Sequence, residues 1–189
     1  MAGSVTEIVN RALDLIGQDP IGSIDDDTRT AGLCARTYPP LRDAVLRLHP
    51  WNFALVRASL PALTSAPAWG FRYAYQLPAA CVRLIRLNIA DPRTPYQVES
   101  GQLLTDVSPP LGVLYVRRVE EPASFDPLFE TVLAYALARD LARTIANSGA
   151  MREDMAKSFE AALREARGVD AVECAAQDLW SDDLLLARL

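Results

Sequence analysis

The chain has 189 residues, a length that suits one domain of ordinary size or a compact core with an appended segment. Half of the residues are hydrophobic, which is enough for a buried core and exceeds what disordered chains carry. The net charge of −5 argues against a general affinity for nucleic acid, because such affinity comes from an excess of Lys and Arg that neutralises the phosphates. Residues 122–189 hold 12 acidic and 7 basic side chains, so the whole net charge lies in this acidic third.

The first predicted helix covers about residues 4–16. Ser4 and Glu7 have the spacing of a capping box, and one apolar stripe follows with helical periodicity. Gly17 is a suitable stop, since glycine readily takes the left-handed conformation that ends helices. The loop that follows contains Asp25, Asp26 and Asp27, and we expect one of them to cap the next helix.

The second predicted helix covers about residues 28–48. Pro39 and Pro40 lie inside it, where they remove backbone donors and crowd the preceding turn, so the sequence predicts a kink or a break there. Pro50 ends the helix, because the residue before a proline resists helical geometry.

Prolines recur between residues 58 and 121, and residues that favour strands cluster between them. The spacing leaves no room for helical crossovers and favours an antiparallel sheet. We expect a β insertion at about 70–120, with short strands at 71–77, 81–87, 96–100, 102–105 and 112–119.

Two helices follow, at about 125–147 and 150–177. Ser124 or Asp126 caps the first, and Pro127 fits its first turn. The pair predicts a helical hairpin, closed by the residues Asn-Ser-Gly at 147–149.

The last stretch, 178–189, is unusually apolar for a chain end, because termini are as a rule polar. It carries acidic residues and a set of large apolar ones, Leu179, Trp180, Leu184, Leu185, Leu186 and Leu189. Two interpretations stay open: the segment packs on its own bundle, or it is a docking tail for another chain.

The fold class predicted from these elements is α+β, mainly α: a helical bundle with a small antiparallel β insertion and an extended C-terminal tail. Residues 1–177 form the one domain, and 178–189 form the tail. Cys34, Cys81 and Cys174 are odd in number and form no C-x-x-C, which predicts reduced thiols. We expect no signal peptide and no membrane span.

No chemical motif emerges, and we expect no catalytic, cofactor-binding or metal-binding residues. His49 is the only histidine, so neither HExxH nor a zinc cluster can be assembled, and no phosphate-binding glycine loop occurs. Residues 25–27 lack the spaced oxygen ligands of a calcium loop and are better explained as a loop with a helix cap.

The stretch HPWNFAL at 49–55 is best explained as a structural corner. Pro50 stops the helix, and Trp51 and Phe53 fold back beneath it, each contributing roughly 2–3 kcal/mol by leaving water. We expect His49 to hydrogen-bond a carbonyl group at the helix end.

Arginines of the β region stand near tyrosines and allow a platform on which bases stack. The more common explanation is a set of strands with arginines on the outer face. The residues in question are Arg83, Arg86, Arg93, Arg117 and Arg118, with Tyr73, Tyr75, Tyr96 and Tyr115.

The order of the pieces resembles the head-to-tail adaptor (connector) family of tailed bacteriophages, the group of tail tubular protein A and the tail accessory factor. The most specific parts are L-x-x-H-P-W-x-F-A at the corner and Y-x-L-P from Tyr75 to Pro78, and the resemblance covers roughly residues 5–173. The Pro39-Pro40 pair departs from the pattern and calls an unbroken second helix into question.

The resemblance implies a non-enzymatic virion protein at the portal vertex, assembled in the host cytoplasm. It implies a dodecameric ring below the portal protein, which prolongs the DNA channel and offers a platform to a nozzle, stopper or tail terminator. DNA would pass through the lumen without sequence-specific binding. The source would be a phage, a prophage or a gene transfer agent.

Two other functions compete with this one. A DNA-packaging component such as a ring of small terminase-like subunits needs a recognition helix and a basic face, which the sequence does not show. The other is a small enzyme from a prophage region, and the lack of further histidines and of a phosphate-binding glycine loop argues against it.

Overall fold

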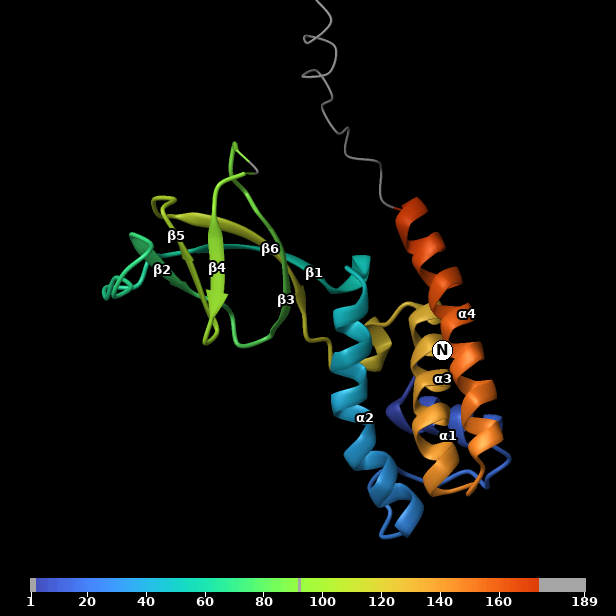
Figure 1. Ribbon diagram of the computed structural model, residues 1–189. Coiled ribbons are helices and arrows are strands. Elements are labelled where there is room, and N and C mark those ends of the chain that lie inside the picture. Colours follow the sequence, from blue (N-terminus) through green and yellow to red (C-terminus); the bar gives the residue numbers. More distant parts are fainter. Residues whose placement is uncertain (1–2, 92, 174–189) are drawn as a thin grey trace, which may run out of the picture.

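The computed structural model describes residues 3–91 and 93–173 of the chain. Within them, four α-helices and two three-stranded antiparallel sheets make a mainly α structure of the α+β class, as predicted. A helical bundle lies on one side and a β region on the other, with α2 between them (Figure 1). The helices are α1 (Val5–Leu15), α2 (Arg29–Leu48), α3 (Pro127–Thr144) and α4 (Gly149–Glu173).

The N-terminus of α1 confirms the predicted capping box. The Ser4 hydroxyl accepts from the Glu7 backbone amide at 3.1 Å, and the Glu7 carboxylate accepts from the Ser4 amide at 2.8 Å. After the helix, Gly17 has a φ of +65°. This conformation is the one that glycine takes without strain, so Gly17 lets the chain turn toward α2.

Helix α2 begins differently from the prediction. Thr28 is its N-cap, with the hydroxyl accepting from the Ala31 amide at 3.1 Å. An aspartate cap is therefore wrong. Asp26 instead accepts from the Ser23 amide at 2.8 Å and shapes the preceding turn.

Helix α2 also continues through Pro39 and Pro40, so of the two predicted alternatives, a kink or a break, the break is wrong. Both prolines are exposed, and the carbonyl groups that lose their helical partners can be hydrated there. Buried residues before and after them, Tyr38 and Leu41, hold both halves of the helix on the core. Packing outweighs the local cost of the prolines.

Helix α3 is the centre of the bundle. Asp126 caps it by accepting from the amides of Leu128 and Phe129, and Pro127 occupies its first turn. Asn147, with a φ of +49°, lies in the turn before α4. Helix α4 begins there, as predicted, and its inner stripe buries Leu163 and Ala166.

The β region contains one strand more than predicted. The sheets are ordered β1-β6-β3 and β2-β5-β4, and every pairing is antiparallel. The additional strand is β1, so the β region begins at residue 55 rather than at about 70. The strands are β1 (Leu55–Leu60), β2 (Tyr73–Gln76), β3 (Cys81–Leu87), β4 (Tyr96–Glu99), β5 (Gln102–Thr105) and β6 (Leu111–Arg117).

The structure has two hydrophobic cores. The larger one lies among the four helices, and a second one lies between the two sheets, with Tyr75, Leu103 and Leu111 fully buried. The β6 strand contributes to both, because Val116 packs in the helical core and Tyr115 in the β core. Because successive side chains of a strand point to opposite faces, β6 joins the β region to the helical bundle.

Candidate functional site

The HPWNF corner is the joint between the two modules. Helix α2 ends at Leu48, and His49 takes an extended conformation before Pro50, as predicted. The Trp51 ring is fully buried, and its Nε1 donates to the Val45 carbonyl at 3.2 Å. The chain then makes a 3₁₀ turn at Asn52–Ala54 and enters β1.

Four aromatic rings pack at this corner. Trp51 meets Phe129 edge-on with ring centroids 5.1 Å apart, and Phe53 meets the same ring at 5.0 Å. Phe125 lies 5.0 Å from Phe129 on the other side. Such edge-on pairs add roughly 0.5–1.5 kcal/mol each beyond the area that they bury. The prediction that Trp51 and Phe53 fold back on the core is confirmed.

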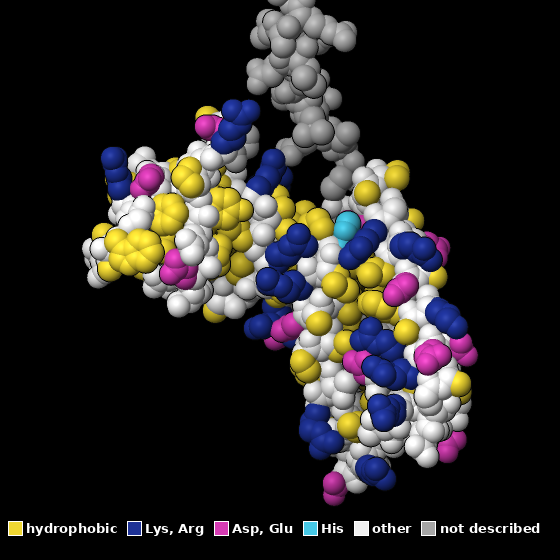
Figure 2. All heavy atoms as spheres, in the orientation of Figure 1, with side chains coloured by type: hydrophobic (Ala, Val, Ile, Leu, Met, Phe, Trp, Pro, Cys, Tyr) yellow, Lys and Arg dark blue, Asp and Glu magenta, His cyan; other side chains and the backbone are white. Residues whose placement is uncertain are grey.

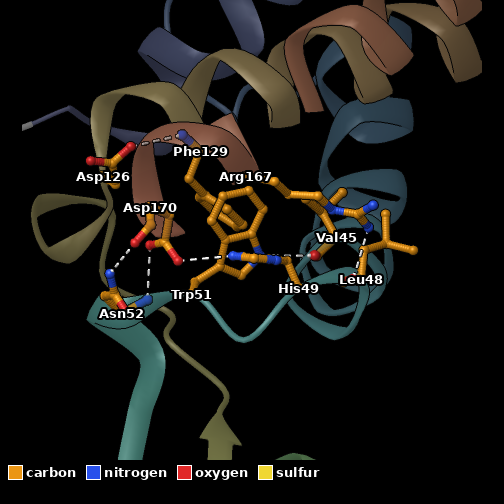
Figure 3. A network of polar contacts seen from close by, with 9 residues as sticks. All are labelled: Val45, Leu48, His49, Trp51, Asn52, Asp126, Phe129, Arg167 and Asp170. Carbon is orange, nitrogen blue, oxygen red and sulfur yellow. Dashed lines mark hydrogen bonds and ion pairs between the residues drawn. The ribbon is translucent and has the colours of Figure 1, made fainter. Parts of the chain in front are cut away.

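A polar clasp ties the last turns of α4 to the corner (Figure 3). One Asp170 oxygen accepts from the Asn52 amide at 3.0 Å, and the other lies 2.9 Å from His49 Nε2. The Asn52 side chain donates to the Asp170 carbonyl at 2.7 Å. One turn earlier, Arg167 donates to the Leu48 carbonyl at 2.8 Å. We call these five residues the α4 clasp.

The partner of His49 differs from the one expected. The sequence suggested a carbonyl group at the helix end, whereas Arg167 bonds the carbonyl of Leu48 and His49 pairs with the Asp170 carboxylate. The clasp joins residues 118 to 121 positions apart. Because Asp170 is 9% exposed, its interactions are shielded from water and fix the end of α4 firmly.

A histidine paired with an aspartate also occurs in catalytic triads, where the second ring nitrogen faces a nucleophile. In the described part of the chain no hydroxyl or thiol group is hydrogen-bonded to His49. The imidazole instead meets the Trp51 ring edge-on at 4.9 Å. The geometry here is that of a structural tie.

A second polar joint connects α2 with the end of β6. The Asp43 carboxylate accepts from Arg42 at 2.9 Å and from Arg118 at 2.7 Å, and Glu120 lies 3.5 Å from Arg42. Arg42 is 7% exposed. Figure 2 shows Lys and Arg side chains gathered where the β region meets α2. No local sequence pattern indicates this joint, because Asp43 and Arg118 lie 75 positions apart.

The tyrosines do not form one platform for stacking. Tyr75 is fully buried, and its hydroxyl donates to the Val107 carbonyl at 2.6 Å. Tyr115 is 6% exposed, whereas Tyr96 is 45% exposed on β4. Tyrosines in the β core cannot meet a base, so this observation favours the alternative of strands with outward arginines.

The two thiols in the described residues lie in apolar surroundings. Cys34 is buried in the bundle and Cys81 is half-buried on β3. Burial raises the pKa of both thiols above the ordinary value, so both remain protonated near neutral pH. This agrees with the predicted reduced state of these two cysteines.

The predicted docking residues Leu179, Trp180, Leu184, Leu185, Leu186 and Leu189 lie outside the described residues. So does Cys174. Between residues 3 and 173, with position 92 left out, no group of three or more His, Cys, Asp or Glu side chains is placed to hold a metal ion. No helix in that part of the chain combines the length and the apolar character needed to cross a membrane.

Neither a comparison with protein-family models nor one with curated proteins gave a match for this chain.

Proposed function

We propose that the chain is a structural virion protein, a head-to-tail adaptor that forms a ring below the portal of a tailed phage or a related particle. The observation that supports this is the joint between the modules. The residues of the L-x-x-H-P-W-x-F-A motif, which carry the resemblance, are the residues that pack and clasp the corner.

A ring subunit has to hold its two modules at a fixed angle, because small rotations at each copy accumulate around the ring. Two polar joints and the aromatic corner cross the boundary between bundle and β region. Rigid placement of a second module is what a platform for tail components requires.

The charge distribution also supports the proposal. The acidic residues concentrated after residue 121 would repel DNA phosphates from a lumen that they line, so DNA could pass without being held.

In this proposal the apolar residues of 178–189 supply attachment. At roughly 1.5–3 kcal/mol for each large side chain that becomes buried, a few of them offset an association cost of about 4–15 kcal/mol. Repetition around the ring multiplies the effect. The partners are the portal protein, neighbouring copies and the next tail protein.

The decisive experiment has two parts. Imaging of particles from the source should place the chain at the portal vertex, and a location elsewhere overturns the proposal. Deletion of 178–189 should then lower binding to the portal protein at least tenfold by gel filtration with light scattering. The matched control carries the same twelve positions in scrambled order, and undiminished docking of the deletion variant rules out the attachment role.

A DNA shift experiment separates the adaptor from a DNA-packaging component. The full chain should leave duplex DNA unshifted at low and moderate salt, because its net charge is −5. A shift that weakens steeply as salt rises supports the packaging alternative instead.

A further inference from the structure

A groove of about 410 Å³ lies between β3 and β4. Its lining is largely apolar, with Leu77, Val82 and Leu84 beside the exposed side chains of Tyr96 and Val98. Val98 is 48% exposed, an unusual state for a large apolar residue on a strand. Figure 2 shows hydrophobic side chains gathered on this face, over β4 and toward β3.

Both walls of the groove are edge strands. In the orders β1-β6-β3 and β2-β5-β4, each of the two strands has a hydrogen-bonded neighbour on one side only. The turn at Ser100 and Gly101, both with positive φ, makes Glu99 and Gln102 a hydrogen-bonded pair. Bonding alternates along an antiparallel pair, so the backbone groups of Tyr96 and Val98 face the open edge.

The β4 edge is the more accessible of the two. Two irregularities interrupt the register of β3, and the Val82 carbonyl already accepts from the Arg47 guanidinium. All four residues of β4 are exposed. An open, regular edge is a template for an added strand.

Two arginines lie at the rim of this groove. Arg47 donates to the Val82 carbonyl, and Arg83 donates to the Arg47 carbonyl at 3.2 Å. Among the described residues no carboxylate pairs with either guanidinium. The groove therefore combines apolar walls with uncompensated positive charge, which suits an extended segment that is both apolar and acidic.

The chain itself contains such a segment. Residues 178–189 place leucines and a tryptophan beside three aspartates, at 178, 182 and 183. We propose that the groove between β3 and β4 binds residues 178–189 of a second copy of this chain, added as a strand to β4. This rests on the proposed function, since the second copy is the neighbour in the ring.

The geometry favours a second copy over the same chain. Helix α4 ends on the bundle side, and α2 and β3 stand between that end and β4 (Figure 1). Binding to the next subunit makes a head-to-tail contact of the kind that closes rings.

Cys81 provides a test, because it lines the groove and keeps a free thiol. In a Cys174→Ser background, the variants Leu184→Cys, Leu185→Cys and Leu186→Cys are each oxidised mildly and run on gels without reductant. We expect at least one to give dimers and longer oligomers, with yields that fall on dilution. Cys81→Ser should remove them, and buried Cys34 serves as an internal control.

Two outcomes overturn the proposal. A disulfide confined to monomers at every concentration shows that the chain binds its own segment. The absence of any cross-link to Cys81 shows that the segment binds elsewhere.

A dye-labelled peptide of residues 178–189 gives a second measurement on the full chain. Val98→Glu places an acidic group in the groove and should weaken peptide binding at least tenfold, as measured by anisotropy. Val172→Glu is the matched control, because Val172 is 85% exposed on α4. This variant should bind the labelled peptide as tightly as the unchanged chain does. Equal affinities of the two variants contradict the proposed site.

The two proposals fail separately. A chain found at the portal vertex without the Cys81 cross-link retains the adaptor function and loses this groove. A chain that cross-links through Cys81 but lies elsewhere retains the groove and loses the adaptor function.

Discussion

Asp170 takes part in three of the four hydrogen bonds of the α4 clasp. Its carboxylate accepts a hydrogen bond from the Asn52 backbone amide and pairs with His49. Its backbone carbonyl accepts from the Asn52 side chain. From sequence alone it reads as a polar residue on the outer face of a long helix. Nothing local distinguishes it, because its partners lie more than a hundred positions away.

Removing this carboxylate should cost stability. Asp170→Ala removes the carboxylate that pairs with His49 and accepts from the Asn52 amide, and the loss of a buried hydrogen-bonding group costs roughly 1–3 kcal/mol. Urea unfolding should therefore show a loss of at least that size. Asp154→Ala, on the exposed face of the same helix, is the control and should change stability by less than about 0.5 kcal/mol. Equal effects of both variants would show that the clasp is energetically unimportant.

Tyr38 shows a different residue effect. It is 3% exposed, and its hydroxyl has no hydrogen-bond partner among the described residues. Burial raises its pKa from 10.0 to about 12; nearby Arg42 lowers it and Glu130 raises it. The folded state therefore favours the neutral phenol.

The folded protein binds the phenolic proton more tightly, so this contribution to stability is complete below pH 10 and is lost as the pH rises toward about 12. Tyr38→Phe should reduce that alkaline loss, and at pH 7 it should be neutral or slightly stabilising. Unfolding measured across this pH range, with Tyr96→Phe as an exposed control, checks both points. A marked loss of stability at pH 7 would show that the hydroxyl is bonded.

At the scale of elements, patterns of periodicity and capping predicted most of the fold. Strands at 81–87 and 102–105 lie where the sequence placed them. β1 was missed because it follows the corner with no intervening turn signal, and its residues alternate only weakly between buried and exposed. The prolines of α2 had the opposite effect. They are a strong local signal for a break, but the packing of the flanking residues on the core keeps the helix continuous.

Because packing holds α2 together in spite of its prolines, replacing one of them should increase the stability of the protein. Pro40→Ala restores a backbone donor for the Arg36 carbonyl, and proline in a helix interior is about 3 kcal/mol less favourable than alanine. We expect stability to rise by about 1–3 kcal/mol, seen as a higher urea midpoint with the same slope. Gly32→Ala in the same helix, where a Cβ meets open space, should raise stability by about 0.5–1 kcal/mol. It serves as the reference for a gain that comes from helix propensity alone. Lower stability of Pro40→Ala would mean that the proline is required for the packing of α2.

At the scale of the whole molecule, the sequence did not show that the hydrophobic residues divide into two separate cores. The sequence suggested one domain with a β insertion, and hydrophobic patterns cannot tell whether strands pack on helices or on one another. The structure places Tyr75 and Leu103 in a core of their own. Long-range pairing, which no local pattern encodes, decides this arrangement.

Two cores should respond separately to damage. Leu103→Ala opens a cavity in the β core and should cost about 2–5 kcal/mol of local stability. We expect faster amide exchange in β2, β5 and β6, with protection in α1 and α3 retained. Leu137→Ala in the bundle is the reciprocal variant. Uniform loss of protection throughout the chain in both variants would show that the molecule unfolds as a single unit.

The position of the clasp has a mechanical consequence. Asp170 lies three residues before Glu173, where α4 ends, so the end of this helix is tied directly to the corner. Traction on the end of α4 is transmitted through Asp170 to Asn52 and His49. A load applied to the end of α4 is thereby delivered to the joint between bundle and sheets, which the aromatic corner and the second polar joint hold at a fixed angle.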